Sequence, residues 1–225
     1  MIQALNSALD NMLERDSDVI IYGEDVGYFG GVFRTTDGLQ EKHGKHRVFD
    51  TPLSEGGIAA TAFGMGLNGL RPVVEMQFAD YIFPAYDQIV NELAKVRHRS
   101  GGEFWSPVTI RTPAGGGIRG GHHHSQSPES QFTHTPGLNV VYCSTPYNAK
   151  GLLISSIESN DPVIFFEPKR CYRGPFYGDP HNVPTWKNHP EAEVPEDYYK
   201  IPIGQGRLVM EGDRCTIIAW GTMVH

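Results

Sequence analysis

Short apolar runs alternate along this chain with helix-length segments, and this alternation constrains the fold more than any other feature. Strands are predicted at Val19–Tyr22, Arg47–Phe49, Pro72–Met76, Val108–Arg111, Val140–Tyr142 and Val163–Phe166. Helices are predicted over residues 1–15, 54–68, 85–97 and 147–159. Unbroken apolar runs are typical of strands buried on both faces. The alternation therefore favours an α/β fold, with a mostly parallel sheet and helices on both faces.

The pattern changes after Glu167, where regular elements stop. Residues 168–202 hold seven prolines among aromatic and polar residues, which is too interrupted for a helix or a central strand. We therefore expect one domain over residues 1–167 and a proline-rich linker over residues 168–202, lying on the domain surface. Residues 203–225 would be the truncated start of a second domain. Two strands predicted there, Arg207–Glu211 and Thr216–Trp220, cannot bury a core by themselves.

The composition of the chain argues against several classes of protein. The net charge of -7, from 19 basic and 26 acidic residues, argues against binding to nucleic acid or an anionic membrane. No apolar run approaches the roughly 20 residues that span a bilayer. Three cysteines far apart predict neither a disulfide framework nor a zinc site. Without a signal peptide, we expect a cytoplasmic protein, or a mitochondrial matrix protein if a transit peptide has been removed, and we prefer the first.

The first candidate site is Ser54-Glu55-Gly56-Gly57, at the start of a predicted helix. A carboxylate in the first turn is favoured by the helix dipole, so Glu55 could simply be a capping acid beside the N-cap Ser54. Four glycines in this helix (Gly56, Gly57, Gly64 and Gly66) lower its intrinsic stability. They are better explained if another backbone segment or a flat ligand approaches closely.

The second candidate is the stretch Gln77–Pro84, which follows a predicted strand. Open α/β sheets bind ligands at the carboxyl ends of their strands, and an aromatic side chain there can stack on a heterocycle. Ordinary core packing would explain the aromatic residues equally well.

The third candidate is the glycine-rich stretch Gly115–Gly121, which is followed by three histidines. A phosphate-binding P-loop is excluded because no Gly-Lys-Ser/Thr follows, and a dinucleotide fingerprint fits poorly because no helix opens directly there. Successive histidines point in different directions and no second cluster completes a zinc site. The pattern favours a flexible loop presenting one imidazole for proton transfer, with solvated loop histidines as the alternative.

Together these segments resemble the β subunits of 2-oxo acid dehydrogenases, which are transketolase-like thiamine-diphosphate enzymes. The resemblance runs from Met1 to His225 and rests on Gly23–Val26, Asp50–Glu55, Phe78–Pro84, His124–Glu129 and Phe165–Lys169. Three features are closer to branched-chain members than to pyruvate-specific ones, namely Phe29–Phe33, Tyr81 and Ser127–Glu129.

The resemblance implies roles for four residues. Glu55 matches the glutamate that hydrogen-bonds the pyrimidine ring of thiamine diphosphate and promotes its activation. Tyr81 matches the aromatic residue stacked against that ring. His124 matches the histidine that assists the reaction with substrate and the transfer of the acyl group. Glu24 matches an acidic network that links paired sites.

The resemblance also implies metal ions. Family members bind a structural potassium ion, largely through carbonyl oxygens, at positions that correspond to Ser106, Val108, Thr109, Ser156, Ser159 and Asp161. Two of these positions commonly carry other side chains in relatives. No Gly-Asp-Gly with a downstream Asn, which would hold Mg²⁺ and the diphosphate, occurs in the sequence. In the family an α subunit supplies that half, which implies a heterotetramer of two α and two β subunits.

The implied function is oxidative decarboxylation of a branched-chain 2-oxo acid, such as 3-methyl-2-oxobutanoate, in branched-chain amino acid catabolism. The acyl group would pass to the lipoyl domain of a dihydrolipoyl acyltransferase core. The alternatives are the same chemistry on pyruvate or acetoin, or a non-catalytic interaction module in which Glu55 only caps a helix. A metal hydrolase that uses the histidine run is a more distant alternative.

Overall fold

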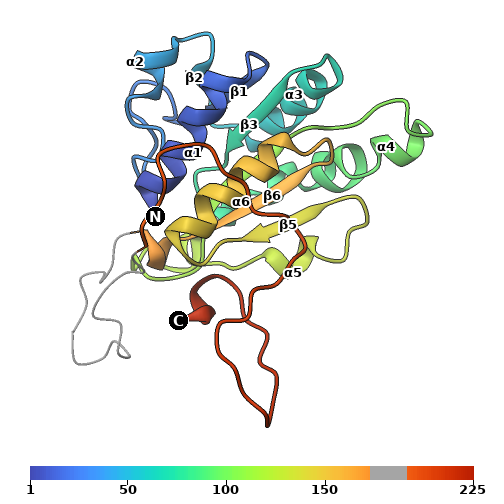
Figure 1. The fold of residues 1–225 in the computed structure, drawn as a ribbon. Coiled ribbons are helices and arrows are strands. Elements are labelled where there is room, and N and C mark those ends of the chain that lie inside the picture. The colour runs from blue at the N-terminus through green and yellow to red at the C-terminus, as the bar shows by residue number, and fades with distance from the viewer. Residues whose placement is uncertain (173–191) are drawn as a thin grey trace.

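The computed structural model describes residues 1–172 and 192–225 and has at its centre a six-stranded parallel sheet, shown in Figure 1. The strand order is β2-β1-β3-β4-β6-β5. The strands are β1 Val19–Gly23, β2 Val48–Asp50, β3 Arg71–Glu75, β4 Thr109–Ala114, β5 Asn139–Tyr142 and β6 Val163–Pro168. Every neighbouring pair of strands is parallel. The predicted α/β class is therefore confirmed, and all six predicted strands of this region are present.

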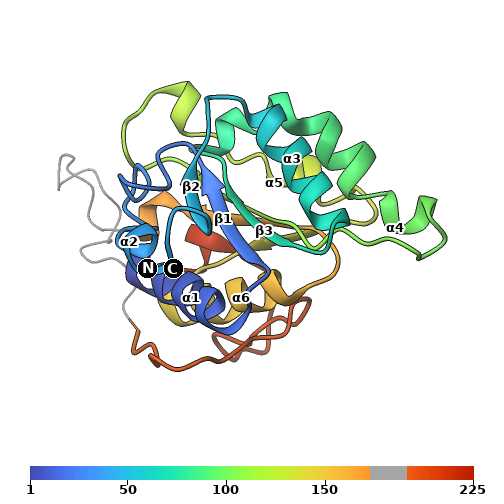
Figure 2. The same ribbon diagram turned by 90° about the horizontal axis from the view of Figure 1, so that it is seen from above.

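Helices cover both faces of the sheet, as Figure 2 shows. On one face α1 (Ile2–Arg15) packs against α6 (Pro146–Glu158), and on the other α3 (Glu55–Leu67) packs beside a π-helix, Gln88–Leu93. The shorter helices and turns are α2 Leu39–His43, α4 Val96–Arg99, α5 Glu129–Phe132, and the 3₁₀ turns Ala79–Tyr81, Phe83–Ala85, His122–His124, Lys169–Cys171 and Gly221–Val224. Two layers of helices around one sheet leave only the strand ends open for a site.

The alternation of side chains along a strand explains why the apolar runs are unbroken. Val19 and Ile21 of β1 belong to the core beneath α1 and α6, whereas Ile20 and Tyr22 belong to the core beneath α3. Successive side chains of a strand point to opposite faces, so a sheet covered on both sides needs an apolar residue at every position. All five residues of β1 are buried.

The prediction of a single helix over residues 85–97 is wrong, because this stretch is divided into helical segments of different types. A 3₁₀ turn at Phe83–Ala85 comes first, then the π-helix Gln88–Leu93, and α4 begins only at Val96. The Ala94 amide donates to the Ile89 carbonyl over 3.0 Å, which is the wide turn of a π-helix. This turn keeps Ile89, Leu93 and Ala94 buried together, whereas a regular α-helix would point Ala94 away from the other two.

The two strands predicted in the last part of the chain are also wrong. Arg207–Glu211 and Thr216–Trp220 form no strand, and apolar side chains such as Met210 and Ile218 are more than four-fifths exposed. A strand needs a hydrogen-bonded neighbour, and no described segment offers one. No helix in the described residues is long and apolar enough to cross a membrane.

Part of the predicted linker follows the outer surface of α6. Lys150 donates to the Pro195 and Glu196 carbonyls over 2.7 Å each, and the Ser155 hydroxyl donates to the Ile201 carbonyl over 2.7 Å. Lys150 is fully buried beneath this segment. Residues 192–202 of the predicted linker thus lie on the domain surface, whereas its first residues do not, since Pro168 ends β6 and Lys169 to Tyr172 are buried or nearly so. Residues 173–191 lie outside the described part.

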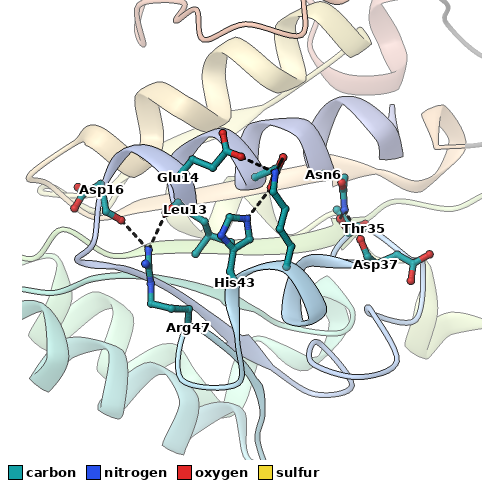
Figure 3. A network of polar contacts seen from close by, with 10 residues as sticks. Asn6, Leu13, Glu14, Asp16, Thr35, Asp37, His43 and Arg47 are labelled. Carbon is teal, nitrogen blue, oxygen red and sulfur yellow. Dashed lines mark hydrogen bonds and ion pairs between the residues drawn. The ribbon is translucent and has the colours of Figure 1, made fainter.

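The connection from β1 to β2 is tied to the polar side of α1, in the network drawn in Figure 3. Lys42 Nζ lies 2.7 Å from Asp10 Oδ2 and 2.6 Å from Glu14 Oε1, and His43 Nε2 lies 2.7 Å from Asp10 Oδ1. Burial alone would raise the pKa of Asp10, but hydrogen bonds from Lys42 and His43 lower it below its usual value. Arg47 then donates to the carbonyls of Asp16 and Val19 over 2.7 Å each. The connection is therefore fixed before it reaches the sheet edge.

Candidate active site

The three candidate segments meet at one edge of the sheet. Glu24 follows β1, Glu55 follows β2, the segment Gln77–Pro84 follows β3, and the glycine-rich loop follows β4. Because all these strands run in the same direction, their carboxyl ends lie along the same edge. This is the edge at which open parallel sheets bind their ligands.

Glu55 lies in the first turn of α3 with its carboxylate half-buried. Ser54 occupies the N-cap position but its side chain makes no capping hydrogen bond. Within the described residues, no hydrogen bond or ion pair involves the Glu55 carboxylate. The next residue, Gly56, faces the Pro84 carbonyl, and a Cβ there would lie only 3.1 Å from that oxygen. The close backbone approach predicted from the glycines is thus made by the segment after β3.

Glu24 is the buried carboxylate beside Glu55. Its side chain is 3% exposed, and neither oxygen has a hydrogen-bond partner among the described residues. Burial, followed by the charges of Glu55, Asp25 and Glu75, raises the pKa of Glu24 to about 7. A buried carboxyl with this pKa can bind or release a proton near neutral pH. Glu24 and Glu55 are thus neighbouring acidic groups, and their place in a network that links paired sites stays a prediction.

Tyr81 and His124 form a hydrogen-bonded pair. The Tyr81 hydroxyl lies 2.9 Å from His124 Nε2, while His124 Nδ1 lies 2.8 Å from the Gly120 carbonyl oxygen. A carbonyl can only accept, so Nδ1 carries a proton and donates it. In neutral imidazole this leaves Nε2 as the acceptor for the Tyr81 hydroxyl. These two hydrogen bonds orient the ring of His124, the histidine that the resemblance singles out.

Phe78 packs against both members of the Tyr81–His124 pair. Its ring centroid lies 4.6 Å from that of His124 and 5.6 Å from that of Tyr81, both in edge-on geometry. On its other side, the ammonium of Lys169 lies 5.4 Å from the centre of the Phe78 ring. Phe78 is almost fully buried, whereas Tyr81 and His124 are only half-buried. Phe78 thus supports the pair from inside, and the pair faces outward.

His122 and His123 do not share this arrangement. Both are exposed, and in residues 1–172 and 192–225 no group of three or more His, Cys, Asp or Glu could hold a metal ion. Their rings pack on each other, with centroids 3.8 Å apart.

A buried charge cluster beneath the site was not predicted from the sequence. Arg111 on β4 donates to Glu75 over 2.8 Å and to both oxygens of Glu167 over 2.7 and 3.0 Å. The Tyr172 hydroxyl donates to Glu167 as well. Burial raises the pKa of Glu75, and the Arg111 guanidinium opposes this rise. Charged residues within apolar strands were the signal that could have revealed this cluster, because a charge on a strand covered on both faces requires a partner.

The predicted potassium positions lie near the amino ends of β4 and β6, at the edge opposite the candidate active site. Ser106 and Val108 precede β4, and the Ser106 amide donates to the Asn160 carbonyl over 3.2 Å, which joins them to the end of α6. The hydroxyls of Ser106 and Thr109 are buried without a partner in the described residues, which fits a cation bound by oxygen atoms.

Three other positions of that set already have partners. The Ser159 carbonyl accepts from Arg71 over 3.2 Å, the Ser156 hydroxyl donates to the Leu152 carbonyl over 2.7 Å, and the Asp161 carboxylate is paired with Arg97 at 2.6 Å. A cation at this edge would therefore be bound mainly by Ser106 and Thr109.

Comparison with known proteins gives the same assignment for the domain. Residues 1–175 match the model of the pyrimidine-binding domain of transketolase. The chain is 58% identical to the 2-oxoisovalerate dehydrogenase subunit beta of Pseudomonas aeruginosa, over 100% of this chain and 65% of that protein. It is 46% identical to the pyruvate dehydrogenase E1 component subunit beta of Acholeplasma laidlawii, over 100% of this chain and 64% of that protein.

A solved structure supports the fold. A chain described as a split gene transketolase, inactive beta4 tetramer, has a TM-score of 0.58 and 18% identity, and the match covers 73% of this chain and 49% of that one. The chain spans slightly less than two thirds of the length of each of the two curated relatives.

Proposed function

Because the chain belongs to the family of transketolase pyrimidine-binding domains, we propose that it forms the pyrimidine-binding half of a thiamine-diphosphate site. The observation that carries this proposal is the Glu55 carboxylate, which has no hydrogen-bond or ion-pair partner among the described residues and lies at the sheet edge that also holds the oriented Tyr81–His124 pair. A carboxylate in a partly dry position can hold a proton shared with a weakly basic ring nitrogen.

The side chains at this edge of the sheet have separate proposed roles around thiamine diphosphate. When bound, thiamine diphosphate supplies a carbon nucleophile for attack on the keto group of a 2-oxo acid. Glu55 would hold the proton at the pyrimidine ring, and the Tyr81 ring would contact that ring. Glu24, whose pKa is raised to about 7, exchanges protons with its neighbour Glu55. His124 Nε2, which accepts from the Tyr81 hydroxyl, is placed to take up a proton and pass it to the reacting oxygen of the substrate.

The substrate we propose is a branched-chain 2-oxo acid, and the chain would be the main part of a dehydrogenase β subunit. The higher identity to a 2-oxoisovalerate dehydrogenase subunit than to a pyruvate dehydrogenase subunit supports this choice. An α subunit would hold Mg²⁺ and the diphosphate in a heterotetramer, and the acyl group would pass to a lipoyl domain of the acyltransferase core. A structural potassium ion near Ser106 and Thr109 belongs to the same proposal.

Substrate turnover tests this proposal directly. The natural full-length protein is co-expressed with its α subunit and supplied with thiamine diphosphate and Mg²⁺. Release of carbon dioxide from 3-methyl-2-oxobutanoate is then compared with release from pyruvate. We expect the branched acid to be preferred, although one methylene contributes only about 1–3 kcal/mol to such discrimination. A preference for pyruvate would move the assignment to the pyruvate subclass.

Glu55→Gln separates the enzyme from a non-catalytic interaction module. The amide keeps the size of the side chain but cannot take up the proton, so the variant should assemble normally and lose turnover. Unchanged turnover in a well-assembled Glu55→Gln complex would show that Glu55 only stabilises the helix.

A further inference from the structure

The loop that carries His124 is held by a carboxylate from the neighbouring segment. Asp80 lies in the 3₁₀ turn Ala79–Tyr81 and is 7% exposed. Its Oδ1 accepts hydrogen bonds from the backbone amides of Ser125 and Gln126, each over 3.1 Å. These are the first two amides after His124. The turn Ala79–Tyr81 therefore carries Tyr81 and, through Asp80, also binds the loop that carries His124.

Further contacts complete the attachment of this loop. The Gly115 amide donates to the Gln126 carbonyl over 2.8 Å and closes the base of the loop. Before the histidine, the Gly120 carbonyl accepts from His124 Nδ1. Asp80 acts on the other side, immediately after the histidine. Because the loop is fixed both before and after His124, the imidazole has little freedom to move away from the Tyr81 hydroxyl.

A buried lysine interacts electrostatically with Asp80. Lys169 is fully buried in the turn after β6, and its Nζ makes one long hydrogen bond, 3.4 Å, to the Pro113 carbonyl. Burial lowers the pKa of Lys169 to about 8, and the negative charge of Asp80 acts in the opposite direction. Hydrogen bonds from amides to an ionised carboxylate are stronger than those between neutral groups. The second oxygen of Asp80 is buried without a partner in the described residues, so the two amides are its main anchor.

We propose that Asp80 is a positioning residue, which fixes the His124 loop through the Ser125 and Gln126 amides and so holds His124 opposite Tyr81. Its effect on chemistry rests on the proposed function, because only then does His124 act on a substrate. The contacts themselves do not depend on that function.

Hydrogen exchange tests the attachment without any activity. In the assembled complex, exchange at peptides covering residues 121–127 is compared between the wild type and Asp80→Ala. We expect exchange to be faster by about tenfold or more in the variant, with the β4 and β6 peptides unchanged. Asp80→Asn retains one acceptor oxygen and should lie between the two. Unchanged exchange in Asp80→Ala overturns the proposal.

Kinetics separate positioning from a purely structural role. With a branched 2-oxo acid and a lipoyl domain, Asp80→Ala should lower kcat by about tenfold while KM changes by less than about twofold. Asp80→Asn should recover most of the loss. Faster loop exchange with unchanged kcat overturns the proposal, and so does a loss of kcat that accompanies faster exchange throughout the sheet.

Asp18→Ala is the matched control. Asp18 is an exposed aspartate in the turn before β1, at the opposite edge of the sheet, and the same substitution there should change neither loop exchange nor kcat. If the wild-type complex turns over no 2-oxo acid, the proposed function fails. Loop exchange in Asp80→Ala then decides by itself whether Asp80 holds the loop.

Discussion

The Tyr81 hydroxyl lies 2.9 Å from His124 Nε2, although 43 residues separate them in sequence. Tyr81 follows β3 and His124 follows β4, and these strands are neighbours in the sheet. The contact between Tyr81 and His124 therefore depends on the strand order. Its role can be tested by removing the hydroxyl oxygen of Tyr81.

Tyr81→Phe removes the hydroxyl and keeps the ring. Because the ring would still lie against the cofactor, we expect KM for the cofactor to stay nearly constant. His124 would lose its partner, and kcat should fall by about 2- to 10-fold, the equivalent of one hydrogen bond. Steady-state kinetics of the assembled complex measure both values. A large rise in the cofactor KM with constant kcat would contradict the role given to the hydroxyl.

Glu24→Gln should change how stability depends on pH. The pKa of Glu24 is raised from 4.5 to about 7, so between these values the folded chain binds a proton that the unfolded chain releases. Stability of the wild type therefore falls as pH rises through this window and stays lower above it. At pH 8 the variant should be more stable by about 2–3 kcal/mol, with little difference near pH 4.

Urea unfolding of both proteins at several pH values measures this effect. Parallel stability profiles for wild type and Glu24→Gln across pH 4–8 would show that Glu24 does not titrate in the window.

Arg111→Met should destabilise the fold strongly. The change leaves Glu75 and Glu167 buried without their common cation, and breaking a buried pair in this way costs about 3–5 kcal/mol. Urea unfolding at neutral pH gives the free energy. Arg99→Met is the matched control, since the Arg99–Glu92 pair is exposed and its loss should have little effect. Equal stability of the two variants would contradict the importance given to the buried cluster.

Potassium should stabilise the wild type through Thr109. Thr109→Val replaces a buried hydroxyl that has no described partner with a methyl group of the same shape. We expect KCl to raise the wild-type Tm by about 2–4 °C relative to choline chloride at equal ionic strength, and to leave the variant unchanged. An equal shift in both proteins would place the ion elsewhere.

The sheet, and the edge at which the candidate site segments meet, could be predicted because local patterns determine them. A strand covered on both faces is apolar throughout, so β1 and β6 are visible as unbroken runs. Parallel strands then bring Glu55 and the segment of Tyr81 to a common edge. The choice of His124 among the three histidines came from the resemblance and stays a prediction; in the structure His124 is the one that hydrogen-bonds Tyr81.

Features that depend on tertiary contacts could not be predicted. The attachment of Ser125 to Asp80 joins positions 45 residues apart, and no local pattern marks it. The π-helix arises because Ala94 must be buried with Ile89, which a helical repeat in the sequence does not reveal. The strands expected at Arg207–Glu211 and Thr216–Trp220 had the right residues but no partner strand.

Helix α1 has consequences for folding during synthesis. Its polar side is occupied by residues of the next 40 positions, such as Lys42, so those contacts can form as soon as that stretch leaves the ribosome. Its apolar side packs on α6, which begins only at Pro146. Until α6 has been synthesised, Leu5 and Leu9 therefore lack the part of their core that α6 supplies and remain partly available to chaperones or to other nascent chains. Substitutions on that side of α1 should reduce the yield of soluble protein even where they leave the finished fold unchanged.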